Sequence, residues 1–148
     1  MQIDNIETPA VLVDMDIVEA NIRAFQAHYD RLKIKVRPHI KTHKIPKIAK
    51  LQLGAGAIGI NCQKIGEAEV MSAAGIEDIL ITYNILGPEK LARLLKLSKN
   101  CQLSVTADNR PTITGLAETF ARADSSLTVL VECDTGAEAA ACKLRKKP

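Results

Sequence analysis

The stretch Lys33-Ile-Lys-Val-Arg-Pro-His-Ile-Lys-Thr-His-Lys44 has two unlike faces at the spacing of a β-strand. Every second residue from Ile34 to Ile40 is apolar, and the residues between and after them are basic: Arg37, His39 and Lys41. Because successive side chains of a strand point to opposite faces, this pattern predicts a strand near 35–41. Helix-start signals follow at Thr42 and Pro46. A strand that ends in lysine and leads into a helix is typical of the catalytic end of an α/β barrel, although a solvated basic edge strand looks the same.

The rest of the chain repeats this unit of strand and helix. A short strand at 8–14 and a helix from Met15 to about Leu32 precede it. The predicted later strands are 57–62, 78–85, 102–108 and 127–134, and the predicted helices are 45–53, 64–74, 87–98 and 110–122. Short βα units in series favour a parallel sheet. A closed barrel needs eight strands and about 250 residues. We therefore predict either an open five-stranded sheet or the N-terminal part, about five βα units, of a parallel (β/α)8 TIM-type barrel.

Polar residues follow the predicted strands at their carboxyl ends. They are Lys41, Asn61, Gln63, Thr82, Asn84, Thr106, Asp108, Glu132 and Asp134. The carboxyl ends of parallel strands meet at one rim, so the pattern predicts a ligand site there. The alternative is that some of them are turn and cap residues, such as Asn84 and Asp108.

Lys41 is the candidate for covalent chemistry. Arg37 and His39 should share its face, and neighbouring cations and an expected partial burial both favour a neutral amine. A neutral amine forms Schiff bases, so Lys41 suggests attachment of a carbonyl substrate or of pyridoxal phosphate. His39 and His43 are four residues apart, but across a strand end, so they do not predict a metal site.

Composition narrows the class of protein. The 148 residues are 47% hydrophobic and carry a formal net charge of +3. We expect one globular unit, which buries roughly 68–70% of its unfolded surface, and no nucleic-acid partner. No apolar run approaches the roughly 18 residues of a membrane span, and no signal peptide is visible. The cysteines lack paired spacing, which favours small core residues in a reducing, cytoplasmic location.

Four blocks of the sequence closely resemble one enzyme family. They are Thr8-Pro-Ala-Val-Leu-Val-Asp-Met-Asp16, Arg37-Pro-His-Ile-Lys-Thr-His-Lys44, Gly59-Ile-Asn-Cys-Gln-Lys-Ile-Gly-Glu-Ala-Glu69 and Gly75-Ile-Glu-Asp-Ile-Leu-Ile81. The family is that of the D-threonine aldolase and D-serine dehydratase-like enzymes, which use pyridoxal phosphate and have the alanine racemase fold type. The resemblance implies a lyase acting on β-hydroxy D-amino acids, a homodimer in the full-length enzyme, and a divalent metal whose ligands lie in a C-terminal β-domain absent from this chain.

The resemblance also implies roles for particular residues. Lys41 would carry the cofactor, with Lys44 as the alternative, and Arg37 and His39 would tune Lys41 or contact the cofactor. The remaining cofactor-site candidates are Asn61, Gln63, Thr82, Asn84 and Asp108. No metal ligand is predicted in this chain.

The resemblance ends near Gly136. The tail 137–148 does not match, and we expect 1–148 to be the N-terminal portion of the barrel domain in a truncated chain with little or no activity. The enzymatic alternatives are an amino-acid racemase and a non-catalytic pyridoxal phosphate-binding protein. The alternative of another class is a catalytically dead remnant or interaction module.

Overall fold

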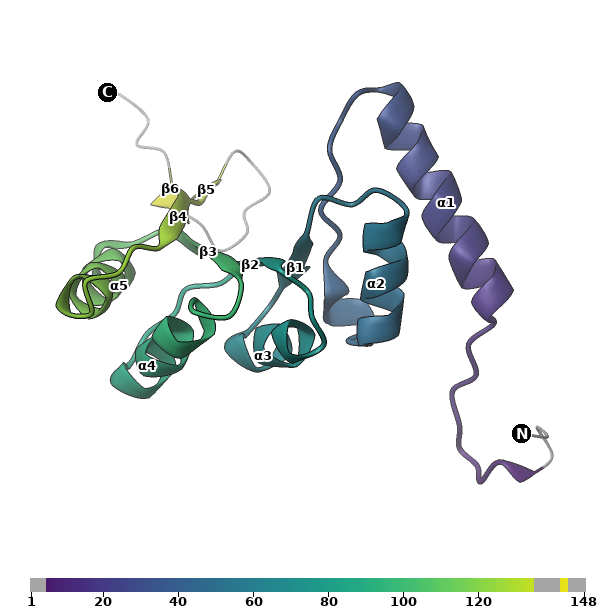
Figure 1. The fold of residues 1–148 in the computed structure, drawn as a ribbon, viewed down its shortest axis with the longest axis horizontal. Helices are drawn as coiled ribbons and strands as arrows, with labels where there is room; N and C mark the ends of the chain where they lie inside the picture. Colours follow the sequence, from purple (N-terminus) through teal and green to yellow (C-terminus); the bar gives the residue numbers. More distant parts are fainter. Residues whose placement is uncertain (1–4, 135–141, 144–148) are drawn as a thin grey trace.

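A computed structural model describes residues 5–134 and 142–143. The helices are α1 (Met15–Arg31), α2 (Pro46–Gly54), α3 (Ile65–Ala73), α4 (Pro88–Leu97) and α5 (Arg110–Arg122), with a 3-10 turn η2 (Ile40–Thr42). The strands are β1 (Ile60–Cys62), β2 (Asp78–Ile81), β3 (Gln102–Ala107), β4 (Thr128–Val131), β5 (Cys133–Asp134) and β6 (Cys142–Lys143). Figure 1 shows α3, α4 and α5 along one face of the arc of strands, with α2 beside β1 and α1 outermost.

The central sheet is parallel and follows chain order, β1-β2-β3-β4. Its register pairs Ile60 with Ile79 and Ile79 with Leu103, so side chains of one face align across the sheet. Ile60 and Ile79 are fully buried, as is Leu94 of α4. Burying each such side chain contributes roughly 1.5–3 kcal/mol. The opposite face of the strands is the one that carries the polar residues.

Local signals set the helix boundaries close to those predicted. Asp14 accepts hydrogen bonds from the N–H groups of Asp16 and Ile17 and so caps α1. Asn109 caps α5 by accepting from the N–H of Thr112 at 3.0 Å. The predicted alternation of strands and helices is confirmed from β1 to β4.

The predicted strand at 35–41 is largely wrong. Ile58 N–H donates to Val36 O at 2.9 Å and Asn61 N–H donates to Pro38 O at 2.8 Å, so the segment does lie along β1. Pro38 has no N–H to donate back, so the ladder shrinks to a single bridge between His39 and Asn61. The chain then turns into η2, which places Lys41 in a 3-10 turn rather than in a strand.

The predicted strand at 8–14 is also wrong. It makes no strand pairing among the described residues, and Val11 is 93% exposed. In Figure 1 this segment runs away from the sheet below α1, so no strand edge is within its reach. A strand without a hydrogen-bonding neighbour is not stable in water.

The end of the described sheet is more exposed than its centre. Val129 and Val131 are 38% and 65% exposed, because β4 is the terminal strand of that sheet. Cys133 is exposed, which corrects the expectation that the cysteines are core residues, whereas Cys62 is buried in the core as predicted. The side chain of Cys142 and most of the tail 137–148 lie outside the described residues.

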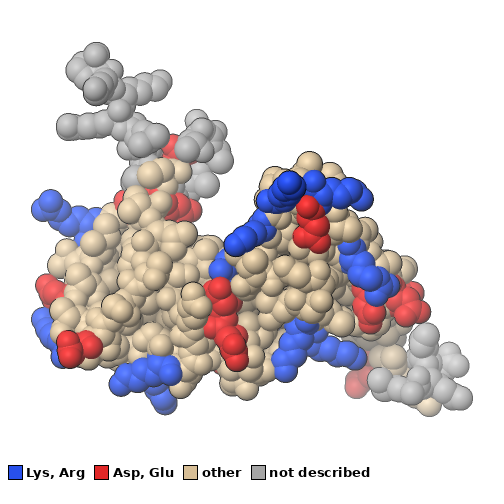
Figure 2. Space-filling model, turned by 45° about the horizontal axis from the view of Figure 1, so that its top comes forward, with Lys and Arg blue, Asp and Glu red and all other residues tan. Residues whose placement is uncertain are grey.

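Figure 2 shows one face of the molecule, on which neither basic nor acidic side chains dominate. Side chains of both charges surround a wide uncharged area. No helix in the described ranges is long and apolar enough to cross a membrane.

Candidate functional site

The carboxyl ends of the strands open onto a cavity of about 520 Å³. Its lining residues are His39, Lys41, Gln63, Thr82, Tyr83, Asn84, Leu86, Asn109 and Glu132. They come from η2 and its cap and from the loops that follow β1, β2, β3 and β4. The volume lies within the range of roughly 300–1,000 Å³ that small-molecule sites occupy. The predicted rim of strand ends therefore encloses a space of suitable size.

His39 is held in one tautomer by its neighbours. Its Nδ1 accepts a hydrogen bond from Lys41 N–H at 3.2 Å, and its Nε2 lies 3.1 Å from Thr82 Oγ1. A neutral ring that accepts at Nδ1 carries its proton on Nε2, so Nε2–H donates to Thr82. The Thr82 hydroxyl in turn donates to the carbonyl of Cys62 at 3.3 Å. Burial and the nearby Lys41 lower the pKa of His39, which favours this neutral form.

Lys41 borders the cavity and makes no salt bridge among the described residues. It is exposed rather than partly buried as expected, because η2 turns it out of the line of the strand. Lys44, the alternative, is different. Its Nζ lies 3.3 Å from Glu67 Oε1, and its backbone φ of 55° turns the chain sharply before α2.

Glu67 is a functional candidate that the sequence reasoning missed. It is 7% exposed, and its Oε2 accepts from Gln63 N–H at 2.8 Å. Burial alone would raise the pKa of this carboxyl. The hydrogen bond from Gln63 and the charges of Lys44 and Lys64 outweigh burial, so the pKa of Glu67 is lowered. The available signal was a glutamate at the third position of a helix, from which carboxylates reach back to the preceding backbone N–H groups.

Asn84 and Asp108 hold each other across neighbouring loops. Asn84 Nδ2 donates to Asp108 Oδ1 at 2.8 Å, and Asp108 N–H donates to Asn84 Oδ1 at 3.3 Å. Asn109 also donates to Asp108. Asn84 lines the cavity, whereas Asp108 lies behind it and is occupied by these donors. The alternative that Asp108 is a turn or cap residue, rather than a residue that contacts a ligand, therefore fits its position equally well.

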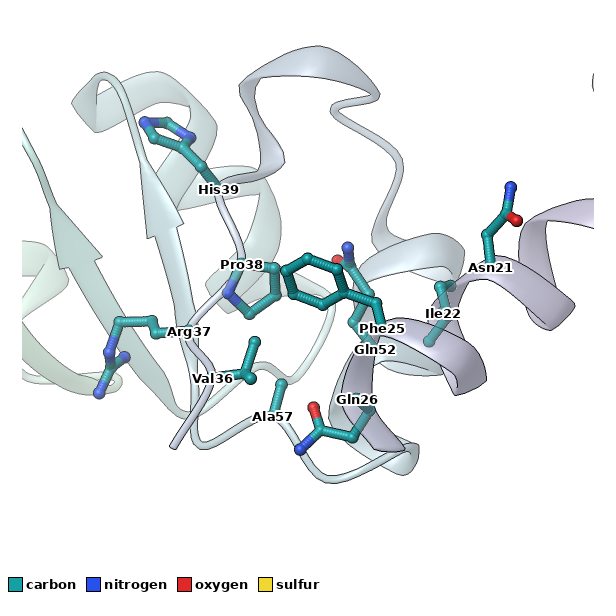
Figure 3. A pocket seen from close by; sticks show the side chains of 10 residues that line it. All are labelled: Asn21, Ile22, Phe25, Gln26, Val36, Arg37, Pro38, His39, Gln52 and Ala57. Atoms are coloured by element: carbon teal, nitrogen blue, oxygen red, sulfur yellow. The ribbon is translucent and has the colours of Figure 1, made fainter. Parts of the chain in front are cut away.

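Arg37 and Asn61 do not line this cavity. The Arg37 guanidinium pairs with Asp78, the first residue of β2, at the amino end of the sheet. Figure 3 shows the Arg37 and His39 side chains leaving their segment toward different ends. Both border a second, largely apolar groove of about 510 Å³ between α1 and residues 36–39. Asn61 donates to Arg37 O at 3.3 Å, and its Oδ1 is buried without a partner in the described structure.

His43 is turned away from the cavity. Its Nδ1 accepts from Ile45 N–H at 3.0 Å, and burial lowers its pKa. Within residues 5–134 and 142–143, no group of three or more His, Cys, Asp or Glu side chains is arranged to hold a metal ion.

Comparison with known proteins gives a consistent picture. The family model of the alanine racemase N-terminal domain matches residues 13–140. A D-threonine aldolase of Arthrobacter sp. is 44% identical over 131 residues, which is 88% of this chain and 35% of the relative.

Solved structures of two enzymes are also similar. The crystal structure of D-threonine aldolase from Filomicrobium marinum superposes with a TM-score of 0.90 at 35% identity, over 95% of this chain and 38% of that one. D-threo-3-hydroxyaspartate dehydratase from Delftia sp. HT23 superposes with a TM-score of 0.85 at 31% identity, over 93% and 36%. The chain spans about a third of the length of these relatives, and its parallel sheet corresponds to the N-terminal part of a TIM-like α/β barrel.

Proposed function

This chain belongs to the alanine racemase N-terminal domain family, and from that premise we propose that it is the N-terminal portion of a pyridoxal phosphate-dependent lyase acting on β-hydroxy D-amino acids. The observation that carries the proposal is Lys41, an amine without a salt-bridge partner in the described structure, at a cavity on the carboxyl ends of parallel strands. The similarity to a D-threonine aldolase and to a hydroxyaspartate dehydratase supports this reaction class.

The residues present fit the cofactor. Lys41 would hold it covalently, and the hydrogen-bonding groups around the cavity belong to His39, Gln63, Thr82 and Asn84. The buried Oδ1 of Asn61 on β1 and the buried Oγ1 of Thr106 on β3 have no hydrogen-bond partner in the described structure. When bound, pyridoxal phosphate supplies an electron sink for bond cleavage at the α-carbon.

The chain's own residues would orient the ligand through hydrogen bonds. His39 presents a neutral ring with its Nε2 proton directed to Thr82, which defines a path for hydrogen bonding along the cavity wall. Asn84 is fixed by Asp108 and so presents one orientation to a ligand. Arg37 at the far end would act on Lys41 only through the position of the segment that it anchors.

The proposal also covers the domain, the substrate, the location, the oligomeric state and the metal. We infer that 1–148 is part of a barrel domain, that the substrate is a small D-amino acid, that the full-length enzyme is a cytoplasmic homodimer, and that its divalent metal is bound by residues outside this chain.

Cofactor loading tests the proposal. Pyridoxal phosphate is added to the full chain and to Lys41→Ala, and visible absorbance is recorded before borohydride reduction and peptide mapping. We expect a reducible band and a label on Lys41 in the wild type, and neither in Lys41→Ala. Lys47→Ala, at an exposed lysine of α2, is the control and should load normally. A wild-type chain without a band, or a band that persists in Lys41→Ala, would refute it.

A further inference from the structure

Lys41 and Lys44 lie three residues apart on one short loop, and Lys41 lines the cavity. Both are exposed, and either amine could reach an aldehyde that enters from solvent. A buried carboxylate distinguishes them. We propose that Glu67 is a positioning residue that sequesters Lys44 and thereby leaves Lys41 as the reactive lysine. This inference rests on the proposed function.

Each of the two carboxylate oxygens of Glu67 has a partner. Oε1 lies 3.3 Å from Lys44 Nζ and Oε2 accepts from Gln63 N–H at 2.8 Å. The Glu67 side chain is 6% exposed, whereas that of Lys44 is 55% exposed. A carboxylate this deeply buried needs a cation and hydrogen-bond donors to remain charged, so the pairing with Lys44 is required by Glu67 itself.

The pairing has a chemical consequence. A lysine side chain held 3.3 Å from a carboxylate must leave that contact before its nitrogen can attack an aldehyde, so Lys44 is disfavoured as a nucleophile. Lys41 has no carboxylate within salt-bridge distance in the described structure, and its backbone N–H donates to His39 Nδ1 at 3.2 Å. The two amines thus differ in reactivity although they share one short loop.

Glu67 also acts on the cavity wall. Its hydrogen bond to the backbone of Gln63 fixes the loop between β1 and α3, and the Gln63 side chain lines the cavity. One side chain on α3 therefore couples the choice of lysine to the shape of the site.

The test compares Glu67→Gln with the wild type in two labelling experiments. Glutamine keeps an acceptor for Gln63 N–H but removes the negative charge that holds Lys44. The first experiment is borohydride reduction after loading with pyridoxal phosphate, followed by peptide mapping. We expect the label on Lys41 in the wild type and a several-fold larger Lys44 share in Glu67→Gln. Glu69→Gln, which removes an exposed partner of Arg93, is the matched control and should leave the distribution unchanged.

The second experiment needs no cofactor. Competitive acetylation with trace acetic anhydride should modify Lys44 several-fold more slowly than Lys41 in the wild type, and Glu67→Gln should remove that difference. The ratio of the two acetylation rates is measured in the wild type without any variant. Equal acetylation of the two lysines therefore overturns the inference even if Glu67→Gln does not fold. A pyridoxyl label confined to Lys41 in folded Glu67→Gln also overturns it. Absence of label on Lys41 in the wild type instead refutes the proposed function and leaves the acetylation result to decide the role of Glu67.

Discussion

The Arg37 guanidinium and the Asp78 carboxylate form two parallel hydrogen bonds, of 2.9 Å and 3.0 Å, at the amino end of the sheet. The cavity lies at the opposite, carboxyl end, beyond His39 and Thr82. One short segment therefore supplies an anchor at one end of the sheet and site residues at the other. This division separates substitutions that affect stability from those that affect binding.

Removing the anchor should destabilise the chain without abolishing cofactor loading. Both partners are largely buried, so Asp78→Ala leaves the Arg37 charge unpaired, and we expect a loss of about 2 kcal/mol in the free energy of unfolding. Urea unfolding measures the change. Glu69→Ala, which removes an exposed ion pair with Arg93, should cost under about 1 kcal/mol. Equal losses for the two variants would contradict this prediction.

Gly59 allows the Arg37 side chain to cross the strand closely. A Cβ at this position would overlap Arg37 Nη1 and lie 2.8 Å from the backbone oxygen of Asp78. We expect Gly59→Ala to lower the free energy of unfolding by roughly 1–3 kcal/mol. Gly54→Ala is the control, because a Cβ there meets nothing within 4 Å. The interpretation fails if both substitutions are neutral in calorimetry.

Acidification should weaken the fold through two histidines. Burial lowers the pKa of His39 and of His43 below 6.5, so the unfolded chain binds more protons than the folded chain just below that pH. The free energy of unfolding should therefore fall as the pH drops from 7 to 5.5, and the fall should be smaller in His39→Gln and in His43→Gln. Urea titrations across this range measure the slope, and an unchanged slope in both variants would count against the assignment.

The exposed edge at β4 should promote self-association. Val129, Leu130 and Val131 are 38%, 44% and 65% exposed, on a strand with one neighbour in the described sheet. Val131→Lys adds a charge at that edge and should shift sedimentation toward the monomer. Thr114→Lys adds the same charge on the exposed side of α5 and should not. If both variants sediment like the wild type, association does not proceed through β4.

The helices illustrate what local signals predict well. The predicted range 110–122 is that of α5, because Asn109 and Pro111 define its start. The prediction that polar strand ends share one rim also agrees with the cavity, which gathers Lys41, His39, Gln63, Thr82 and Asn84. Their roles in binding stay predictions.

Features that depend on residues distant in the sequence were predicted less well. Period two predicted that Arg37 and Lys41 share a face, but Pro38 interrupts the ladder and η2 rotates Lys41 out of it. Val129 and Val131 are exposed although apolar, because burial of a strand residue depends on a neighbouring strand rather than on the residue itself.

The order of residues is thus sufficient to define the βα alternation, the helix ends and the lysine to suspect, because each depends on side chains a few positions apart. The pairing of Arg37 with Asp78 and of Lys44 with Glu67 joins residues far apart in the chain. These contacts form only when the segment before η2 packs along β1 and α3 packs behind the loop. The packed fold therefore selects which cations are neutralised and which one, Lys41, remains at the cavity.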